Sequence, residues 1–600
     1  MLRPPQPSAV SHRRDRLAIV GVAVALLLIT GSGLSWLFVP TQLQQLAKLG
    51  ELRYHEDGFR HLSLALSPAR LLGLQLTMGG TLLLGLGGWL AIGSRAVKVI
   101  GPQLLRAIGR LRGNWQRLPA SFQRYTLLLL TLVLAARLYY LVAFPLSTDE
   151  IASFDYFVSH GPRVIFSYYP IPNNHLLYNL LAWPLRLTAL PPLLVMRLPT
   201  YVLGAISLLL TLGLLSRIIG WRRALLISAL TSLTPLSVYY GAVGRGYGLQ
   251  LGMLQVGFFA VLELLRPKSN YRQLAWAALM LSSVAGLLLV PSYVYPLVAL
   301  LLGAAAGMCR DRNWPALGSL TMAGAIIGVV VVLLYSPIGA ISGWDRLLAN
   351  RYVTSRAAAQ FWPGFRPRLY EVAAELFGLP VRVSGPLWLG IALLGGAISG
   401  RMLGGARRRA ALLAWLLVAL PIGLLAAQRV FPLARVLLYI PWAGGLWLML
   451  GAPRLKSTGR ARKWALPIAV AGLAGMGLHG LYLREPQRRG SQRETRLVQQ
   501  AYSWLRHAVR PGSQAPVVGL QAPIHELFFA HYLALSQNPS LHLVSYRTPQ
   551  PDKQYDFIVL THAAEAAGSR VPKPYLASYS DILVTIYTNP APRQQPAAIP

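Results

Sequence analysis

The sequence predicts an all-α polytopic membrane protein with about 13 transmembrane helices and a small C-terminal α/β domain outside the membrane. Of its 600 residues, 54% are hydrophobic and only 13% are charged, whereas soluble domains carry about 25% charged residues. Many segments of about 17–23 residues are almost free of charge, and this is the length that a helix needs to cross a bilayer. A soluble multidomain protein, a disordered chain and an outer-membrane barrel are therefore excluded. The single cysteine, Cys309, excludes a disulfide framework and a multi-cysteine metal site.

Thirteen apolar segments are long enough to be membrane spans. The predicted spans are residues 17–39, 71–93, 125–146, 198–219, 224–240, 247–265, 274–290, 293–309, 316–335, 386–400, 410–427, 433–450 and 464–483. Residues 176–194 are also apolar, but they contain Pro184, Arg186, Pro191 and Pro192. Because proline removes backbone donors and a charge inside the bilayer is costly, we expect this segment to lie in the outer interface as an amphipathic helix.

The net charge of +38 is distributed in short basic clusters between the apolar segments, such as Arg222–Arg223 and Arg407–Arg409. Loops assigned to one side of the membrane hold lysine and arginine at about three times the density of the loops on the other side. The positive-inside rule then predicts a cytoplasmic N-terminus and an extracytoplasmic C-terminal tail. Because the charge follows the predicted membrane topology, no nucleic-acid partner is predicted.

Three regions are predicted along the chain. Residues 1–124 hold two extra N-terminal spans and a basic cytoplasmic loop, and residues 125–483 form the main transmembrane domain with outer loops at 147–197 and 336–385. Residues 484–600 have a soluble composition and are expected to form an extracytoplasmic α/β domain. Its predicted elements are helices at 493–510 and 524–535, strands at 517–520, 556–560 and 582–587, and a disordered end at 591–600.

Two adjacent carboxylates follow the predicted span 125–146, in the run Ser147-Thr148-Asp149-Glu150. Neighbouring side chains on a helix do not face the same way, so one carboxylate can face a substrate while the protein holds the other. A carboxylate that is partly withdrawn from water can serve as a general base. The alternative is that both residues only cap the first turn of the helix that follows.

Two further clusters lie on the same predicted side of the membrane. The first contains Asn174 and His175 at the start of the interfacial helix, where a lone histidine can alternatively have a purely structural role. The second is the run Gly241–Gly248, whose glycines allow close backbone approach and whose Arg245 offers a fork suited to phosphate. The alternative for Arg245 is a long side chain that extends from a helix end to the interface.

The order of these motifs resembles the GT-C glycosyltransferases, and among them the superfamily of protein O-mannosyltransferases and aminoarabinose transferases. In that superfamily an acidic pair in the first outer loop precedes a His- or Lys-Pro-Pro-Leu motif, an Arg-Leu-Pro-Ser-like helix start and an Ala-Arg-Tyr-like motif. The matching runs here are Asp149-Glu150, Asn174-His175-Leu176-Leu177, Arg197-Leu198-Pro199 and Arg245-Gly246-Tyr247. The resemblance covers residues 120–310 well and the remaining spans in outline.

The resemblance implies a GT-C-like fold and a glycosyltransferase of the bacterial plasma membrane. Such an enzyme moves a sugar, a hexose or a pentose, from a polyprenyl-phosphate donor to a glycan, lipid or protein acceptor on the extracytoplasmic face. Asp149 would be the base of an inverting transfer, and the adjacent Glu150 would be a second catalytic residue. The residues that would contact the substrates are Asn174, His175, Arg245, Tyr247, Arg429 and Arg435.

A divalent cation is left open by the sequence. Superfamily members that bind one carry an aspartate just after the Arg-Tyr motif, whereas this chain continues Tyr247-Gly248-Leu249-Gln250. The prolines of the His- or Lys-Pro-Pro-Leu motif are also replaced, by Leu176 and Leu177. Because a hard cation needs several oxygen ligands, no metal ligand is assigned.

Two other functions stay open at this point. A multispan transporter would carry ionisable groups inside its spans, but Glu263 is the one acidic residue in a predicted span, beside Arg137, Arg217 and Arg435. A non-catalytic component of cell-surface glycan assembly is the other alternative, and it would make Asp149 dispensable.

Overall fold

The computed structural model describes most of the chain from residue 68 onward. The described residues are 68–169, 172–348, 355–402, 405–451, 460–509, 515–536, 541–546, 554–567, 569 and 571–590. The predicted span 17–39 and the predicted disordered end 591–600 lie outside them.

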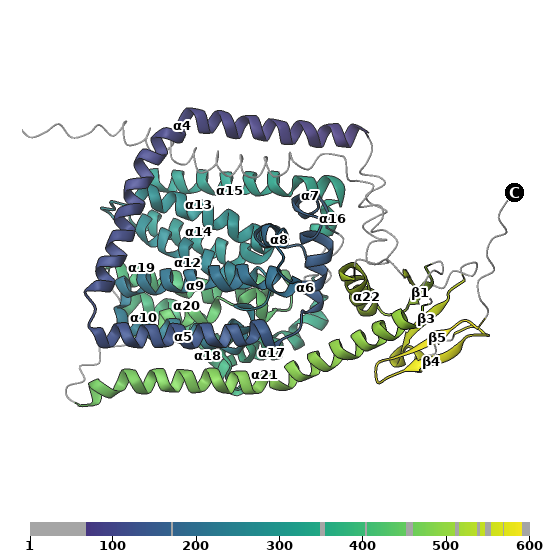
Figure 1. Cartoon of the computed structure of the whole chain (residues 1–600). Helices are drawn as coiled ribbons and strands as arrows, with labels where there is room; N and C mark the ends of the chain where they lie inside the picture. Colours follow the sequence, from purple (N-terminus) through teal and green to yellow (C-terminus); the bar gives the residue numbers. More distant parts are fainter. Residues whose placement is uncertain are drawn as a thin grey trace, which may run out of the picture.

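A bundle of long apolar helices forms the body of the protein (Figure 1). Among the described residues, nine helical segments are long and apolar enough to cross a membrane. Seven of them lie in α5 (Ala120–Ala143), α9 (Pro192–Ile219), α12 (Tyr247–Leu264), α13 (Arg272–Leu289), α15 (Trp314–Ile341), α18 (Val381–Met402) and α19 (Gly405–Gln428). The other two each combine a 3-10 turn with the helix that follows it: Pro291–Arg310 contains α14 (Val294–Arg310), and Ala434–Gly451 contains α20 (Ile440–Gly451). Large side chains such as Tyr293, Trp388 and Trp442 are fully buried between these helices. The predicted all-α polytopic class is confirmed.

Two of the remaining predicted spans belong to much longer helices. Residues 71–93 lie in α4 (Pro68–Gln116), which bends and then runs across one end of the bundle (Figure 1). The predicted span 464–483 and the predicted helix 493–510 are parts of one continuous helix, α21 (Arg460–Ala508). Near residue 484, where the sequence suggests a boundary, Glu485 pairs with Arg488 and Arg489 one turn ahead, and such pairs favour a continuous helix.

The predicted span 224–240 is broken into two helices. α10 (Trp221–Leu233) and α11 (Pro235–Tyr240) are separated by Thr234, whose backbone is extended at φ −60° and ψ 143°. The ring of Pro235 disfavours helical geometry at the residue before it and offers no N–H group to the helix. The break leaves a six-residue helix that leads directly into the glycine-rich run at 241–248.

Short helices gather at one end of the bundle, which we call the site end (Figure 1). They include α6 (Thr148–Ser153), the π-helical turn η2 (Phe154–Val158), α7 (Pro162–Ser167) and α16 (Trp344–Leu348). The predicted interfacial segment contains α8 (Leu176–Arg186), whose 11 residues are too few to cross a core of about 30 Å, as expected. The predicted outer loop 336–385 contains the 20-residue helix α17 (Ala358–Phe377).

A small α/β domain follows α21, as predicted. Its five-stranded sheet has the order β2-β1-β3-β5-β4, formed by β1 (Val517–Leu520), β2 (His542–Ser545), β3 (Phe557–Thr561), β4 (Leu576–Ser580) and β5 (Val584–Thr588). β1 is parallel to β2 and β3, whereas β5 is antiparallel to β3 and β4. β2 and β4 were not expected; β4 is mostly exposed and lacks an alternating apolar pattern. The helices of the domain are α22 (Pro523–Leu535) and α23 (His562–Ala566).

The sheet lies beyond the site end of the bundle (Figure 1). Two polar contacts connect this part of the chain to the bundle. On α22, Nδ1 of His531 is 2.9 Å from Oδ1 of Asp155 in η2, and on α21 the Gln492 amide donates to the Ala143 carbonyl at 2.7 Å. Burial raises the pKa of the Asp155 carboxyl, and the hydrogen bond to His531 opposes that rise.

Candidate functional site

The acidic pair stands at the start of α6. The Ser147 hydroxyl accepts a hydrogen bond from the Glu150 amide at 3.3 Å, and the Glu150 carboxylate accepts one from the Ser147 amide at 2.9 Å. This reciprocal capping box starts α6 shortly after α5 ends. Glu150 thus takes part in the helix cap, as the capping alternative expected, although the cap is not its only contact. The Asp149 side chain is free of the cap and is 47% exposed.

Glu150 is also bound by Arg197 of α9, and both side chains are completely buried. Nε and Nη2 of Arg197 donate to the two carboxylate oxygens at 2.7 Å each. The remaining donors of Arg197 bond to three carbonyls at the end of α5, those of Leu141, Phe144 and Pro145, at 2.8–2.9 Å. This bidentate pair therefore fixes the end of α5, the start of α6 and the first turns of α9 relative to one another.

The loop that follows α11 is attached to the same carboxylate. The Gly244 amide donates to Oε1 of Glu150 at 2.7 Å. Burial alone would raise the pKa of Glu150, but the Arg197 guanidinium and the hydrogen bonds outweigh it and hold the pKa below its ordinary value. Because both oxygens are occupied, the geometry favours a positioning role for Glu150 over proton transfer.

Asp149 faces two guanidinium groups from distant parts of the chain. Its Oδ2 is 3.5 Å from Nη2 of Arg245 and 3.9 Å from Nη1 of Arg435, which lies in the 3-10 turn η4 (Ala434–Leu437) before α20. Arg245 is almost completely buried, whereas the side chain of Arg435 is 34% exposed. A half-exposed carboxylate and two cations therefore converge at the site end.

Tyr247 and His175 complete the wall of this cluster. The Tyr247 ring lies near both guanidinium groups, with its centre 5.9 Å from Cζ of Arg245 and 6.0 Å from Cζ of Arg435. The His175 ring packs edge-on against Tyr247 at 5.2 Å, and its Nδ1 is 2.5 Å from the Leu289 carbonyl. Burial, together with the positive charge of Arg245, lowers the pKa of His175 well below its usual value. The neutral ring donates from Nδ1 to the Leu289 carbonyl and supports Tyr247 by packing against it.

The two asparagines before His175 have different tasks. The Asn174 amide donates to the carbonyls of Ile165 and Tyr168 at 2.7 and 3.0 Å. Its amide group, predicted to contact the substrate, is thus used to hold the loop together. Asn173, which was not singled out, hydrogen-bonds Arg245 and donates to the Asp149 carbonyl at 2.9 Å. Of the predicted residues, the structure thus brings Asp149, Glu150, His175, Arg245, Tyr247 and Arg435 together.

Arg429 stands apart from this cluster in the part of the chain that the structure describes. It is exposed, its backbone has a positive φ of 54°, and its carbonyl accepts a hydrogen bond from the Arg356 amide at 3.1 Å. Arg429 and Arg435 flank the same turn in the sequence, but only Arg435 reaches Asp149.

Close backbone packing explains two glycines of the run 241–248. A Cβ at Gly244 would lie 2.7 Å from the Met196 carbonyl oxygen, and one at Gly246 would lie 2.6 Å from that of Leu289. Neither position can accept a side chain without a shift of the backbone, so the loop stays close to α9 and α13. The close packing of this loop against α9 and α13 keeps the Arg245 guanidinium beside the Asp149 carboxylate.

The donor set does not fit a divalent cation. The Glu150 oxygens are occupied, and the exposed Asp149 carboxylate has two guanidinium groups within 4 Å. A hard dication needs several oxygen ligands, and neighbouring positive charges repel it. Within the described residues, no group of three or more His, Cys, Asp or Glu side chains is arranged to hold a metal ion.

The comparisons with known proteins give a match at the level of structure. No protein-family model matches the chain, and no curated protein matches its sequence. The crystal structure of ArnT from Cupriavidus metallidurans bound to undecaprenyl phosphate aligns with a TM-score of 0.55 and 12% sequence identity, over 78% of this chain and 98% of ArnT. This chain has the fold of ArnT. The apo-state structure of ArnT covers the same shares at 13% identity and a TM-score of 0.39. The GT-C-like fold implied by the motifs is confirmed by the ArnT alignment.

Proposed function

We propose that this chain is a membrane glycosyltransferase that moves a sugar from a polyprenyl-phosphate donor to an acceptor on the extracytoplasmic face, with inversion at the anomeric carbon. The observation that carries the proposal is the convergence of the half-exposed Asp149 with Arg245 and Arg435 at the end of a membrane bundle. A lipid-linked donor has its chain in the bilayer and its phosphate at the interface, and the proposed topology puts this cluster at the same level. The fold shared with ArnT, whose structure holds undecaprenyl phosphate, supports the same assignment.

The proposed step needs one base and one anion site. The acceptor hydroxyl oxygen attacks the anomeric carbon, its proton passes to Asp149, and the bond from the anomeric carbon to the phosphate oxygen breaks. The leaving group departs as polyprenyl monophosphate. Arg245 and Arg435 stabilise the charge that develops on the phosphate, and a single displacement inverts the anomeric centre.

Arg245 and Arg435 are not equivalent in this proposal. Arg245 is buried and hydrogen-bonded to Asn173, so its guanidinium is held in place beside Asp149. In this proposal the same guanidinium also contacts the phosphate of the donor. Arg435 is more exposed, and its ion pair with Asp149 is longer, with 3.9 Å between Nη1 and Oδ2. Both side chains have an Nε that is buried without a hydrogen-bond partner. The pair is thus rich in donors that an anion can accept from.

Substitution of Arg245 tests the anion site. Lysine keeps the charge and loses the bidentate fork, so Arg245→Lys should reduce the rate of sugar transfer. Arg245→Ala should reduce it more, by about 2–4 kcal/mol of transition-state stabilisation, if the phosphate contact strengthens during transfer. The measurement is kcat/KM for transfer by the purified variants, with Arg217→Lys, an exposed arginine of α9, as the matched control. Transfer at the wild-type rate by both Arg245 variants would return this residue to the role of a structural helix-end arginine.

The predicted topology is testable on its own. A reporter that is active only outside the cytoplasm should give signal when fused after Pro600 and none when fused after residue 223, because the basic clusters assign residues 220–223 to the cytoplasm. Signal after residue 223 would contradict the proposed topology, in which residues 176–194 do not cross the membrane.

A further inference from the structure

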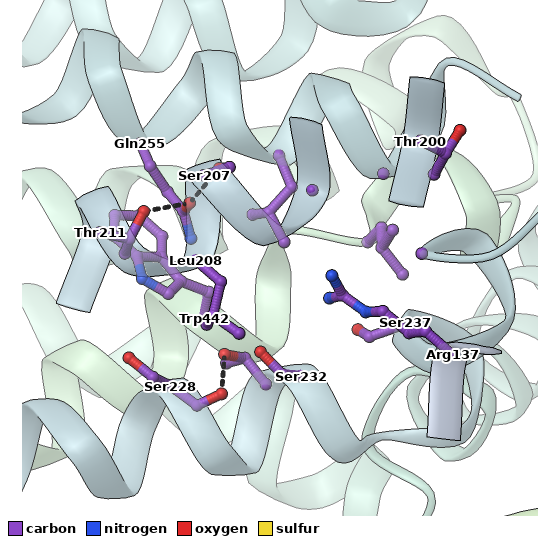
Figure 2. A pocket seen from close by; sticks show the side chains of 16 residues that line it. Arg137, Thr200, Ser207, Leu208, Thr211, Ser228, Ser232, Ser237, Gln255 and Trp442 are labelled. Carbon is purple, nitrogen blue, oxygen red and sulfur yellow. Dashed lines mark hydrogen bonds between the residues drawn. The ribbon is translucent and has the colours of Figure 1, made fainter. Parts of the chain in front are cut away.

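A small cavity lies inside the bundle, and its lining residues are other than those of the Asp149 cluster (Figure 2). Its volume is about 40 Å³, which is room for about three water molecules. Half of the residues that line it have hydroxyl or amide side chains: Thr200, Ser207, Thr211, Ser228, Thr231, Ser232, Ser237 and Gln255. These residues come from α9, α10, α11 and α12, so the cavity is a shared feature of the packed bundle.

Arg137 of α5 provides the one charge in the wall of this cavity, as far as the described lining residues show. The residue is 8% exposed, and its Nε and Nη1 are buried without a hydrogen-bond partner. Figure 2 shows its guanidinium pointing from one side into the space toward Ser232 and Trp442. It lies six residues before the end of α5, about 9 Å into the span.

Two glycines fix the guanidinium in this place. A Cβ at Gly241 would lie 2.5 Å from Nε of Arg137, and one at Gly204 would lie 3.2 Å from its Nη1. The side chain therefore passes between two backbones that carry no side chains of their own. An arginine that only extended toward the membrane surface would not need this space between the backbones at Gly204 and Gly241.

Other donors face the same space. The Ser228 hydroxyl is buried without a partner. The Gln255 oxygen accepts hydrogen bonds from Thr211 and Ser207 at 2.6 and 3.5 Å, which leaves its amide nitrogen as a donor. None of the described lining residues is acidic. A buried positive charge without a counter-charge is strongly unfavourable, so donors of this kind without a carboxylate favour an anion over water alone.

We infer that this cavity is a binding site for one small monovalent inorganic anion of chloride size, held by Arg137 and the hydroxyl and amide donors around it. The volume excludes a phosphate that carries a prenyl chain, so the site is distinct from the proposed donor site. The anion neutralises Arg137 and joins α5 to α9, α10 and α12. The inference does not depend on the proposed glycosyltransferase activity.

Anion-dependent stability tests the site. The full chain, purified in detergent without chloride, is heated in sodium gluconate or in sodium chloride at equal ionic strength. Chloride should raise the apparent unfolding midpoint in a saturable way, by about 2 °C once it exceeds its dissociation constant a hundredfold. Bromide should act in the same way. An equal midpoint in gluconate and in chloride at every concentration would overturn the inference.

Two variants locate the effect. Arg137→Gln should abolish the chloride dependence, whereas Arg217→Gln, at an exposed position on α9, should keep it. An undiminished chloride shift in Arg137→Gln would place the anion elsewhere and overturn the inference. If Arg137→Gln does not fold, anomalous diffraction from wild-type crystals grown in bromide decides the question. A bromide peak beside Arg137 supports the site, and a cavity that holds only water contradicts it.

Discussion

Replacement of Asp149 by asparagine is expected to reduce sugar transfer at least about a hundredfold, since loss of a general base costs about 10²–10⁴ in rate. Asparagine has nearly the same shape and keeps the ability to accept a hydrogen bond. It removes the charge and the lone pair that takes the acceptor proton. The Asp149 side chain is about half exposed and makes no part of the α6 capping box, so the fold should survive the change. The measurements are transfer by the purified variant and its affinity for the lipid-linked donor.

A matched control separates base loss from a general charge effect. Asp311→Asn also removes a carboxylate from an arginine pair, with Arg409 at 2.7 Å, and this pair is far along the chain from the site. It should transfer sugar at the wild-type rate. Wild-type transfer by Asp149→Asn itself, with donor and acceptor that support the parent enzyme, would exclude Asp149 as the base and favour a non-catalytic role in glycan assembly.

Loss of the Arg197 side chain should be the most destabilising single change at the site. Arg197→Leu leaves the Glu150 carboxylate buried without its partner and frees three carbonyls at the end of α5. Breaking a buried pair in this way typically costs about 3–5 kcal/mol. We expect a clearly lower thermal midpoint in detergent, and loss of transfer because α9 is no longer fixed to the end of α5 and to the Glu150 carboxylate of α6.

The comparison variant is Arg409→Leu, which breaks the partly exposed pair with Asp311 and should cost at most about 1 kcal/mol. The double substitution Arg197→Leu with Glu150→Leu should be less destabilised than the sum of the single changes, because the unpaired charge is gone. If Arg197→Leu unfolds no earlier than Arg409→Leu, Glu150 is not the buried hub described here.

The features predicted from the sequence are those that local patterns encode. Uncharged runs of sufficient length predicted the nine long apolar helical segments of the described residues, and short runs rich in β-forming residues predicted β1, β3 and β5. The break at Pro235 was not predicted, although proline gave the signal, because the apolar run continues on both sides of it. The continuity of α21 depends on charge pairs and on its contact with α5, and neither gives a strong sequence pattern.

The site was predicted in part for the same reason. The position of Asp149 and Glu150 after a span was visible in the sequence, and so was the possibility that they cap the helix that follows. The partner of Glu150 lies 47 positions away, at the arginine of the Arg-Leu-Pro run, and nothing local identifies that pairing. Asn173 and Asn174 are chemically identical neighbours. Which of them faces Arg245 is decided by the path of the loop, so the three-dimensional fold was needed to choose between them.

The central claim is that this chain consumes a polyprenyl-phosphate-linked sugar by a step that depends on Asp149. The most direct test is mass spectrometry of the polyprenyl lipids in membranes that contain the donor pool, an acceptor-bearing lipid and glycan fraction, and either the wild-type chain or Asp149→Asn. The account predicts that the wild type converts one lipid-linked sugar to free polyprenyl monophosphate. Asp149→Asn should consume the same donor at least about a hundredfold more slowly. Equal consumption of that donor by both proteins would contradict it.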